Sequence, residues 1–326
     1  MSAPAISVIM PCYNAGRYVE EAVRSVLGQT HSHLELIAVD DHSTDNTLEV
    51  LQSLAADPRV RVVPLPENVG QAAAANRGWE LARGRFIKFF DADDIMAPRM
   101  LELQLQRLEG RDDCVASAEW GRFHDDDVGT YRSNPQSVWR DMDARDWLVE
   151  SWMGARPMMQ CGLWLIPRAL LEKTGAWDER LSLINDFEFF ARVLCAAQEV
   201  LFTPDCPMHY RSGVAGSLSG AKGKKAVESA YLSTTLGVEH LLAQRSDERA
   251  RQACANMVQD FLFTYYPACP ELLDKIQAKL AELPAPTVQP AGGRGFRLAA
   301  TILGWRTARR LQMAGGKYPD YRRLGN

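Results

Sequence analysis

The first 90 residues alternate between short apolar runs and helical stretches of about ten residues. Four runs have the length and composition of buried strands, namely 6–10, 34–39, 60–65 and 86–90. The stretches between them, 18–27, 46–54 and 71–82, have helical patterns. This alternation predicts right-handed βαβ units and a mostly parallel central sheet flanked by helices. The chain is therefore predicted to be an α/β protein.

Beyond Pro98 the pattern is less regular. It predicts helices over 100–108, 144–152, 168–174 and 185–196, and strands over 114–123 and 161–166. It then predicts three helices of a C-terminal appendage, over 226–244, 248–265 and 270–281. Residues 283–295 have the proline and glycine content of a linker, and 296–313 is predicted to be one final helix.

The composition is that of an ordinary globular protein, with 46 % hydrophobic and 24 % charged residues in 326. No apolar run reaches the roughly 18 residues that indicate a membrane-spanning helix. The N-terminus enters a strand pattern at Ile6 without a signal-peptide pattern, and the seven cysteines form no CxxC pair. We therefore expect a cytoplasmic protein with reduced thiols.

The net charge of −4 conceals an asymmetry. From Ala291 onward eight basic residues stand against one acid, Asp320, so this tail carries +7 and the rest of the chain −11. Apolar residues between the arginines of 296–313 suggest an interfacial helix on an anionic membrane surface. A helix packed on the body of the protein or in a homodimer is the alternative. We expect no nucleic-acid partner.

The most informative motif is Asp91-Ala92-Asp93-Asp94, which follows the apolar run Phe86–Phe90. Crowded carboxylates cost free energy unless a cation or hydrogen bonds offset the charge. In open α/β sheets, ligands bind outside the carboxyl ends of the strands. The side chains of Asp91 and Asp93 share one side of an extended segment. The motif therefore predicts a site for a hard divalent metal that holds phosphate oxygens, whereas Asp94 is interpreted as structural.

Two other strand ends carry candidate ligand groups. Pro11 and Tyr13 follow the first strand and can form a flat wall for a base or sugar ring, although a simple strand stop explains them equally. Asp40 and Asp41 follow the second strand. A carboxylate there can accept hydrogen bonds from a base N–H group or a ribose hydroxyl.

Two later segments are candidates for chemistry. Asp186 lies at the start of the predicted helix 185–196, where an acid stabilises the helix dipole; it can also serve as a general base. The segment His209-Tyr210-Arg211 precedes a stretch rich in glycine, serine and lysine, Ser217–Lys225. This stretch is either an exposed linker or a mobile loop whose cations close over phosphates. The chain lacks GxGxxG after the first strand, a P-loop and a GxSxG elbow.

Taken together, the motifs of residues 6–219 resemble those of the family 2 glycosyltransferases, which are inverting sugar transferases with a GT-A fold. The resemblance rests on five segments that occur in the family's order: Pro11-Cys12-Tyr13-Asn14, residues 39–45, Asn68-Val69-Gly70 through Gly78, Asp91–Asp94, and Trp177–Phe190. It implies a catalytic domain over 1–220, with a nucleotide-sugar-binding half (1–98) and an acceptor-binding half (99–220). The appendage (221–282), the linker (283–295) and the basic tail (296–326) follow.

The resemblance also implies roles for individual residues. Asp91 and Asp93 would hold Mn²⁺ or Mg²⁺ and the diphosphate, and Asp186 would be the catalytic base. The donor, expected to be a UDP-sugar, would be bound by Pro11, Tyr13, Asn14, Asp40, Asp41, Asn76, Asp91, Ala92, Asp93 and Arg211. The acceptor would be a glycan or a lipid-linked glycan in bacterial-type polysaccharide synthesis, which is compatible with a peripheral position on the inner face of the plasma membrane.

Two alternatives stay open. A sugar nucleotidyltransferase also combines an α/β sheet with carboxylates and a metal, but it needs a glycine-rich basic loop after the first strand, where this chain offers only Gly16 and Arg17. A non-catalytic subunit with the same fold is the other alternative. Many family members have a histidine shortly after the Tyr-Arg pair, whereas Ser212, Gly213 and Val214 follow here.

Overall fold

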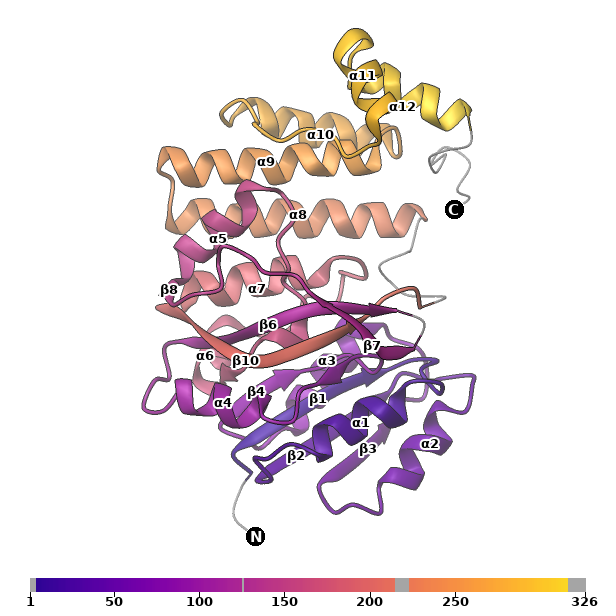
Figure 1. Cartoon of the computed structure of the whole chain (residues 1–326), viewed down its shortest axis with the longest axis vertical. Coiled ribbons are helices and arrows are strands. Elements are labelled where there is room, and N and C mark those ends of the chain that lie inside the picture. Colours follow the sequence, from indigo (N-terminus) through magenta and orange to yellow (C-terminus); the bar gives the residue numbers. More distant parts are fainter. Residues whose placement is uncertain (1–3, 125, 215–222, 316–326) are drawn as a thin grey trace. The chain divides into compact units, whose positions relative to one another are not determined.

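The structure, a computed structural model, describes residues 4–124, 126–214 and 223–315 (Figure 1). The chain divides into two compact units. The first unit comprises Met1–Trp147, Met159–Glu179 and Arg192–Ala215, and the second comprises Leu148–Met158, Arg180–Ala191 and Gly216–Asn326. The domain limits expected from the sequence stay a prediction.

A five-stranded sheet organises the N-terminal part of the first unit. Its strands are β1 (Ile6–Cys12), β2 (Leu34–Asp40), β3 (Val60–Pro64), β4 (Phe86–Phe89) and β9 (Ile166–Pro167), in the order β3-β2-β1-β4-β9. The first four are parallel, and β9 pairs with β4 in the antiparallel sense. The predicted α/β class with a mostly parallel sheet is confirmed.

Three helices connect the parallel strands: α1 (Val19–Leu27), α2 (Thr47–Leu54) and α3 (Gln71–Leu81). Right-handed crossovers in this strand order put α1 and α2 on one face of the sheet and α3 on the other, and α1 and α2 lie in front of the strands in Figure 1. Gly78 lets α3 approach the sheet closely, because a Cβ atom there would lie 2.4 Å from Cγ2 of Ile9. Because β1 to β4 run parallel, their carboxyl ends lie at one common edge of the sheet, and the site is found there.

A second sheet packs in the same unit. Its strands are β5 (Ile95–Met96), β6 (Val115–His124), β7 (Asp127–Ser133), β8 (Met142–Asp143) and β10 (Glu199–Arg211). The order is β5-β10-β6-β7, and β8 also pairs with β10. The remaining elements of this region are α4 (Met100–Arg107), a 3₁₀ turn (Cys161–Leu163) and α6 (Arg168–Thr174). Two further helices, α5 (Ala144–Met153) and α7 (Asn185–Ala196), run from one unit into the other.

The predicted strand over 161–166 is wrong. The side chain of Gln160 accepts a hydrogen bond from the backbone N–H of Gly162 at 2.7 Å and bends the chain into the 3₁₀ turn Cys161–Leu163. Only Ile166 and Pro167 then pair as a strand. A hydrogen bond between a side chain and the nearby backbone thus stabilises a turn where the apolar run predicted a strand.

The second unit is mainly helical. Its helices are α8 (Lys224–Gln244), α9 (Glu248–Tyr265), α10 (Pro270–Ala281), α11 (Arg294–Leu303) and α12 (Trp305–Ala314). The first three confirm the helical appendage. The single helix predicted over 296–313 is instead two helices, because Gly304 has a φ of 77° and ends the first of them. Most of the predicted loop Ser217–Lys225 lies outside the described residues. Among the described helices, none has the length and apolarity needed to cross a bilayer.

Candidate active site

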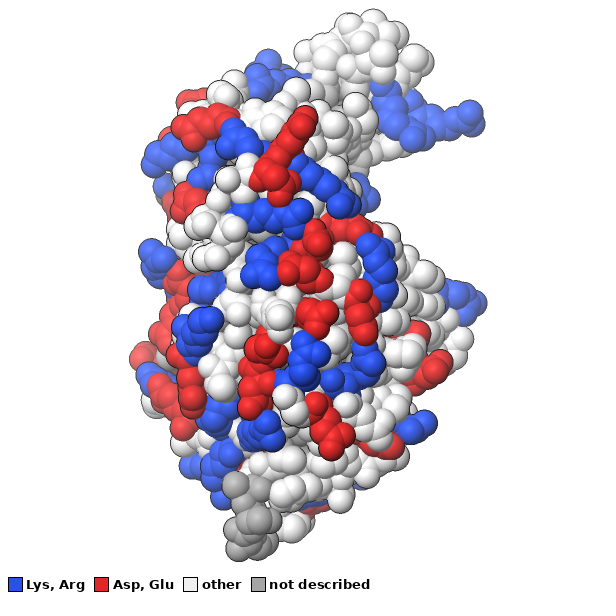
Figure 2. Space-filling model, turned by 90° about the vertical axis from the view of Figure 1, so that its left-hand side faces the viewer, with Lys and Arg blue, Asp and Glu red and all other residues white. Residues whose placement is uncertain are grey.

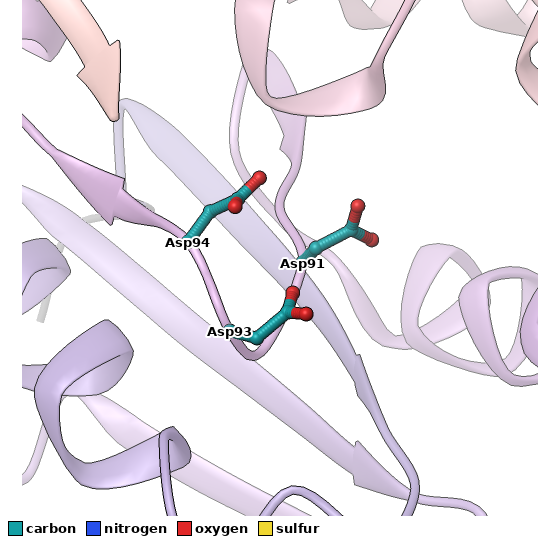
Figure 3. Close-up of side chains that lie close together, drawn as sticks. All are labelled: Asp91, Asp93 and Asp94. Atoms are coloured by element: carbon teal, nitrogen blue, oxygen red, sulfur yellow. The ribbon is translucent and has the colours of Figure 1, made fainter. Parts of the chain in front are cut away.

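The four residues Asp91–Asp94, called the aspartate loop here, form the turn that follows β4. The backbone N–H of Phe90 still donates to the carbonyl of Ile9 at 2.9 Å, so the chain leaves the sheet immediately before Asp91. The three carboxylates project to the same side of the loop (Figure 3). One ligand oxygen from each lies within 4.8 Å of the others. The predicted grouping of Asp91 with Asp93 is therefore seen, and Asp94 joins them.

Neutral donors hold two of these carboxylates. The side-chain Nε2 of Gln160 lies 2.8 Å from Oδ2 of Asp91 and 2.9 Å from Oδ2 of Asp94. The Nε2 of Gln71 donates to Oδ1 of Asp91 at 2.8 Å, and the backbone N–H of Arg211 donates to Oδ1 of Asp94 at 2.9 Å. Among the described residues, no side chain donates to the carboxylate of Asp93. Sequence analysis assigned no role to either glutamine: Gln71 lies within the segment Asn68 through Gly78 and Gln160 in no motif, and neither position marks a donor to a carboxylate.

The aspartate loop is electrostatically strained. Burial, and after it the charge of Asp91, raises the pKa of Asp93 to about 7. Burial likewise raises the pKa of Asp91, and burial together with the neighbouring aspartates raises that of Asp94 well above its usual value. A divalent cation would offset the crowded negative charge. Three oxygen donors within reach of one another also suit Mn²⁺ or Mg²⁺, so the residues present fit such an ion.

Arg211 is buried and contacts the backbone of the aspartate loop. Its side chain is 2 % exposed and pairs with Glu21 at 2.6 Å and with Asp126 at 2.8 Å. Its Nε donates to the backbone carbonyl of Asp93 at 2.7 Å, and the guanidinium stacks on the ring of Phe123. The structure thus assigns its polar atoms to protein partners; its predicted contact with the donor stays a prediction.

The ends of β1 and β2 lie side by side, because Cys12 is in register with Asp40. Asp40 is 1 % exposed, and its Oδ2 accepts from the backbone N–H of Ser43 at 3.2 Å. Its Oδ1 is buried and has no hydrogen-bond partner among the described residues. Asp41 accepts from the backbone N–H groups of Val69 and Gly70 at 2.7 and 2.8 Å. The unpartnered oxygen of Asp40 is suited to a donor group on a ligand.

The loop after β1 presents an aromatic surface beside these acids. Tyr13 is 52 % exposed, so its ring is accessible to a ligand. Asn14 ties this loop to the next one, since its backbone N–H donates to Ser43 Oγ at 3.0 Å and its Oδ1 accepts from the backbone N–H of Thr44 at 2.8 Å. Pro11 pairs with Val39 within the sheet.

A buried thiol connects this end of the site to the aspartate loop. The pKa of Cys12 is raised well above its usual value by burial and then by the charges of Asp40, Asp91 and Asp93. The thiol therefore lies within the electrostatic reach of both groups of acids. The two groups of acids lie at the carboxyl ends of β2 and β4, which flank β1 in the sheet.

Asn76 and Ala92 have interior positions. The side-chain amide of Asn76 donates to the carbonyl of Trp177 at 3.0 Å, and its Oδ1 accepts from the Trp177 N–H at 2.9 Å. It also bonds Glu179 at 2.9 Å. Ala92 is 7 % exposed within the aspartate loop. Asn76 therefore fastens α3 to the segment after α6, and its predicted donor contact stays a prediction.

Asp186 belongs to the second unit, at the second position of α7. Its side chain is half-buried, while its neighbours Phe187 and Glu188 are buried. Ile184, two residues earlier, is 39 % exposed and has a φ of 48°, which is rare for a β-branched residue. Such backbone conformations concentrate at functional sites.

The fold and the aspartate loop define an α/β protein of the GT-A type. Residues 7–175 match the sequence profile of Glycosyl transferase family 2, and the chain belongs to this family. It is 49 % identical over 104 residues to TuaG of Bacillus subtilis (strain 168), named for teichuronic acid biosynthesis; this covers 32 % of the chain and 41 % of that protein. It is 41 % identical over 104 residues to the chondroitin synthase of Pasteurella multocida (strain Pm70), and this match covers 32 % of the chain and 11 % of that protein.

Two longer matches extend the comparison. The uncharacterized glycosyltransferase MJ1057 of Methanocaldococcus jannaschii is 26 % identical over 205 residues, which covers 62 % of this chain and 68 % of that protein. The crystal structure of S. aureus TarS 1–349 with UDP-GlcNAc superposes with a TM-score of 0.68 at 20 % identity. The superposition covers 96 % of this chain and 92 % of the TarS chain. The similarity to TarS establishes the fold, while the matches to TuaG and chondroitin synthase span less than half of those proteins.

Proposed function

We propose that the chain is an inverting glycosyltransferase that moves a sugar from a nucleotide-diphosphate donor to a hydroxyl of a glycan or lipid-linked acceptor. The observation that carries this proposal is the aspartate loop, three crowded carboxylates at the carboxyl end of β4 in a family 2 chain. The names of TuaG and of the Pasteurella chondroitin synthase support a role in bacterial polysaccharide or glycoconjugate synthesis.

We assign the donor to the edge of the sheet formed by the first unit. Tyr13 and Pro11 would stack on the nucleobase, and Asp40 with its unpartnered Oδ1 would accept a hydrogen bond from the base or ribose, assisted by Asp41. Asn14, Asn76, Ala92 and Arg211 would shape the same site. The UDP-GlcNAc in the TarS crystal structure supports a UDP-sugar as the donor.

Asp91 and Asp93 would hold Mn²⁺ or Mg²⁺. When bound there, the cation supplies positive charge for the diphosphate of the departing nucleotide. Asp94 shares the Gln160 donor with Asp91 and accepts from the backbone N–H of Arg211, so we assign it the role of shaping the loop. Partial burial of Asp91 and Asp93 strengthens their interaction with charged groups.

Asp186 would take the proton of the acceptor hydroxyl. The acceptor oxygen then forms a bond to the anomeric carbon while the bond from that carbon to the diphosphate oxygen breaks, with the electron pair leaving on the nucleoside diphosphate. One such displacement inverts the anomeric configuration. A carboxylate at the start of a helix, with buried neighbours, suits the role of a general base.

The proposal is tested by incubating the protein with Mn²⁺, a panel of UDP-sugars and candidate glycan acceptors. We expect nucleoside diphosphate release that a chelator abolishes, and a product whose NMR couplings show the anomeric configuration opposite to that of the donor. A product that retains the donor configuration would contradict the single displacement. Release of pyrophosphate from a nucleoside triphosphate and a sugar phosphate would favour a nucleotidyltransferase, and nucleotide binding without turnover would favour a non-catalytic subunit.

We also propose that the C-terminal helices contact an anionic membrane surface. Of the seven large apolar side chains that are exposed among the described residues, four lie on α11 and α12: Leu298, Ile302, Leu303 and Leu311. Figure 2 shows an uncharged surface at the end of the second unit formed by these helices, with basic side chains beside it. Apolar residues next to arginines suit an interface of anionic lipid.

Co-sedimentation with phosphatidylglycerol vesicles tests this contact. We expect binding that falls at least tenfold in Leu298→Ser/Ile302→Ser and that weakens as salt rises, since both apolar burial and charge contribute. Equal binding by the variant would overturn the membrane contact. Loss of a dimer in the variant, with no vesicle binding by the wild type, would favour the homodimer instead.

A further inference from the structure

Four residues on one side of α8 face the segment Arg180–Ala191 in the second unit. They are Ser229, Ser233, Gly237 and His240, whose spacing of four, four and three places them on one helical stripe. This stripe is called the α8 rail here. Its members are polar or small, whereas a stripe that only packed against a core would be apolar.

The two serines bond the backbone of the segment that precedes Asp186. The Oγ of Ser229 accepts from the backbone N–H groups of Ser182 and Leu183 at 2.8 and 2.9 Å and donates to the Leu183 carbonyl at 3.0 Å. The Oγ of Ser233 donates to the carbonyl of Ile184 at 2.7 Å. Both serines are buried, so these bonds satisfy hydroxyl groups and backbone groups that water cannot reach.

The bond to Ile184 holds the one residue of this segment whose backbone is strained. The φ of 48° at this β-branched residue persists only where the surrounding contacts impose it. The same carbonyl accepts from the backbone N–H of Phe187 at 3.0 Å, which starts the first turn of α7. Ser233 therefore fixes the turn that determines where α7, and with it Asp186, begins.

The residues after Asp186 also contact the α8 rail. The backbone N–H of Glu188 donates to Ser233 Oγ at 3.2 Å, and its carboxylate lies 3.0 Å from Nε2 of His240. A Cβ atom at Gly237 would lie 2.5 Å from the ring of Phe187, so only glycine allows this approach. Asp186 is thus bracketed on both sides by residues that α8 holds.

We propose that the α8 rail, through Ser229 and Ser233, positions Asp186, so that the first helix of the appendage sets the rate of the proton-transfer step. This inference rests on the proposed role of Asp186 as the base. Positioning is worth a great deal at this step, because a misplacement of about 1 Å can cost about 100-fold in rate. Donor binding, which involves the first unit, should not depend on the rail.

The test compares Ser229→Ala/Ser233→Ala with Thr235→Val, which removes a hydroxyl from the same helix that has no hydrogen-bond partner among the described residues. We expect the serine variant to lower kcat at least tenfold with an unchanged KM for the nucleotide sugar, and Thr235→Val to leave both unchanged. Placed in an Asp186→Asn background, the serine substitutions should cause no further loss, because the group that they position is gone. A full further loss in that background, or a raised donor KM with normal kcat, would overturn the proposal.

Two further measurements, on Gly237→Ala and by hydrogen exchange, distinguish a failure of this inference from misfolding and from a failure of the proposed function. Gly237→Ala favours the helix but displaces Phe187, so kcat should fall at a temperature where circular dichroism shows the variant to be folded. In the serine variant the backbone amides of Ser182 and Leu183 should exchange at least tenfold faster than in Thr235→Val. Unchanged exchange would overturn the rail even in an active protein, whereas faster exchange in a protein that transfers no sugar would refute the proposed function alone.

Discussion

The aspartate loop and the start of α7 both present carboxylates, but they are held in different ways. In the aspartate loop, side-chain amides of Gln71 and Gln160 bond the carboxylates themselves. At the start of α7, hydroxyls of α8 bond the backbone before and after Asp186. The first arrangement concentrates negative charge and leaves it to be neutralised by a ligand. The second fixes the backbone position from which the Asp186 side chain projects.

The largest expected difference between the two regions is the effect of Asp93→Ala. We expect transfer to fall by about 10³-fold or more, because a metal at a leaving group supplies several kcal/mol and each 1.36 kcal/mol is a factor of ten. Nucleoside diphosphate release at saturating Mn²⁺ measures this. Asp274→Ala, at an exposed position of α10, is the matched control and should be as active as the wild type. Comparable activity in the two variants would remove Asp93 from the metal site.

A smaller effect is expected at Gln160. Gln160→Ala removes the donor that Asp91 and Asp94 share, and loss of a group that orients a metal ligand weakens metal binding by about 10–100-fold. Mn²⁺ titration followed by electron paramagnetic resonance measures the affinity without any turnover. Gln106→Ala, at an exposed position of α4, serves as the control. An affinity for Mn²⁺ within twofold of the wild type would show that the amide does not orient the site.

A third expected effect is a pH dependence of stability. Because the folded state raises the pKa of Asp93 from 3.8 to about 7, ionisation of this group costs stability above that pH, and the cost disappears below the unfolded pKa. The metal-free protein should therefore gain stability as pH falls from about 7 towards about 4, with a slope of at most about 1.4 kcal/mol per pH unit from this residue. Urea unfolding of wild type and Asp93→Asn measures it; equal slopes would contradict the assignment, and Mn²⁺ should flatten the wild-type slope.

The two regions also differ in how well the sequence predicts them. The aspartate loop was predictable because Asp91 and Asp93 are two residues apart and follow an apolar run, so the local pattern places them at a strand end. The parallel sheet was predictable for the same reason. Strand pairing between distant segments was harder to predict. Residues 161–166 have the composition of a strand, but a hydrogen bond to the side chain of Gln160 stabilises a turn there.

The supporting residues were not predictable, because their roles depend on contacts between distant parts of the chain. Gln160 reaches the aspartate loop across many intervening residues, and a glutamine carries no motif. Ser229 and Ser233 occur within the helix predicted over 226–244, where the pattern assigns no role to a serine. For Arg211 the resemblance implies a donor contact, which stays a prediction, and the structure adds that its guanidinium pairs with Glu21 and Asp126.

The central claim is that the aspartate loop serves the leaving group and Asp186 the nucleophile. It is tested most directly by Asp186→Asn, with the affinity for Mn²⁺ and UDP measured by calorimetry and the transfer rate measured on the same preparation. We predict a loss of about 10²–10⁴-fold in transfer, as expected for a general base, with metal and nucleotide affinity within twofold of the wild type. Full transfer activity in Asp186→Asn, or an equal loss of nucleotide binding, would contradict the claim.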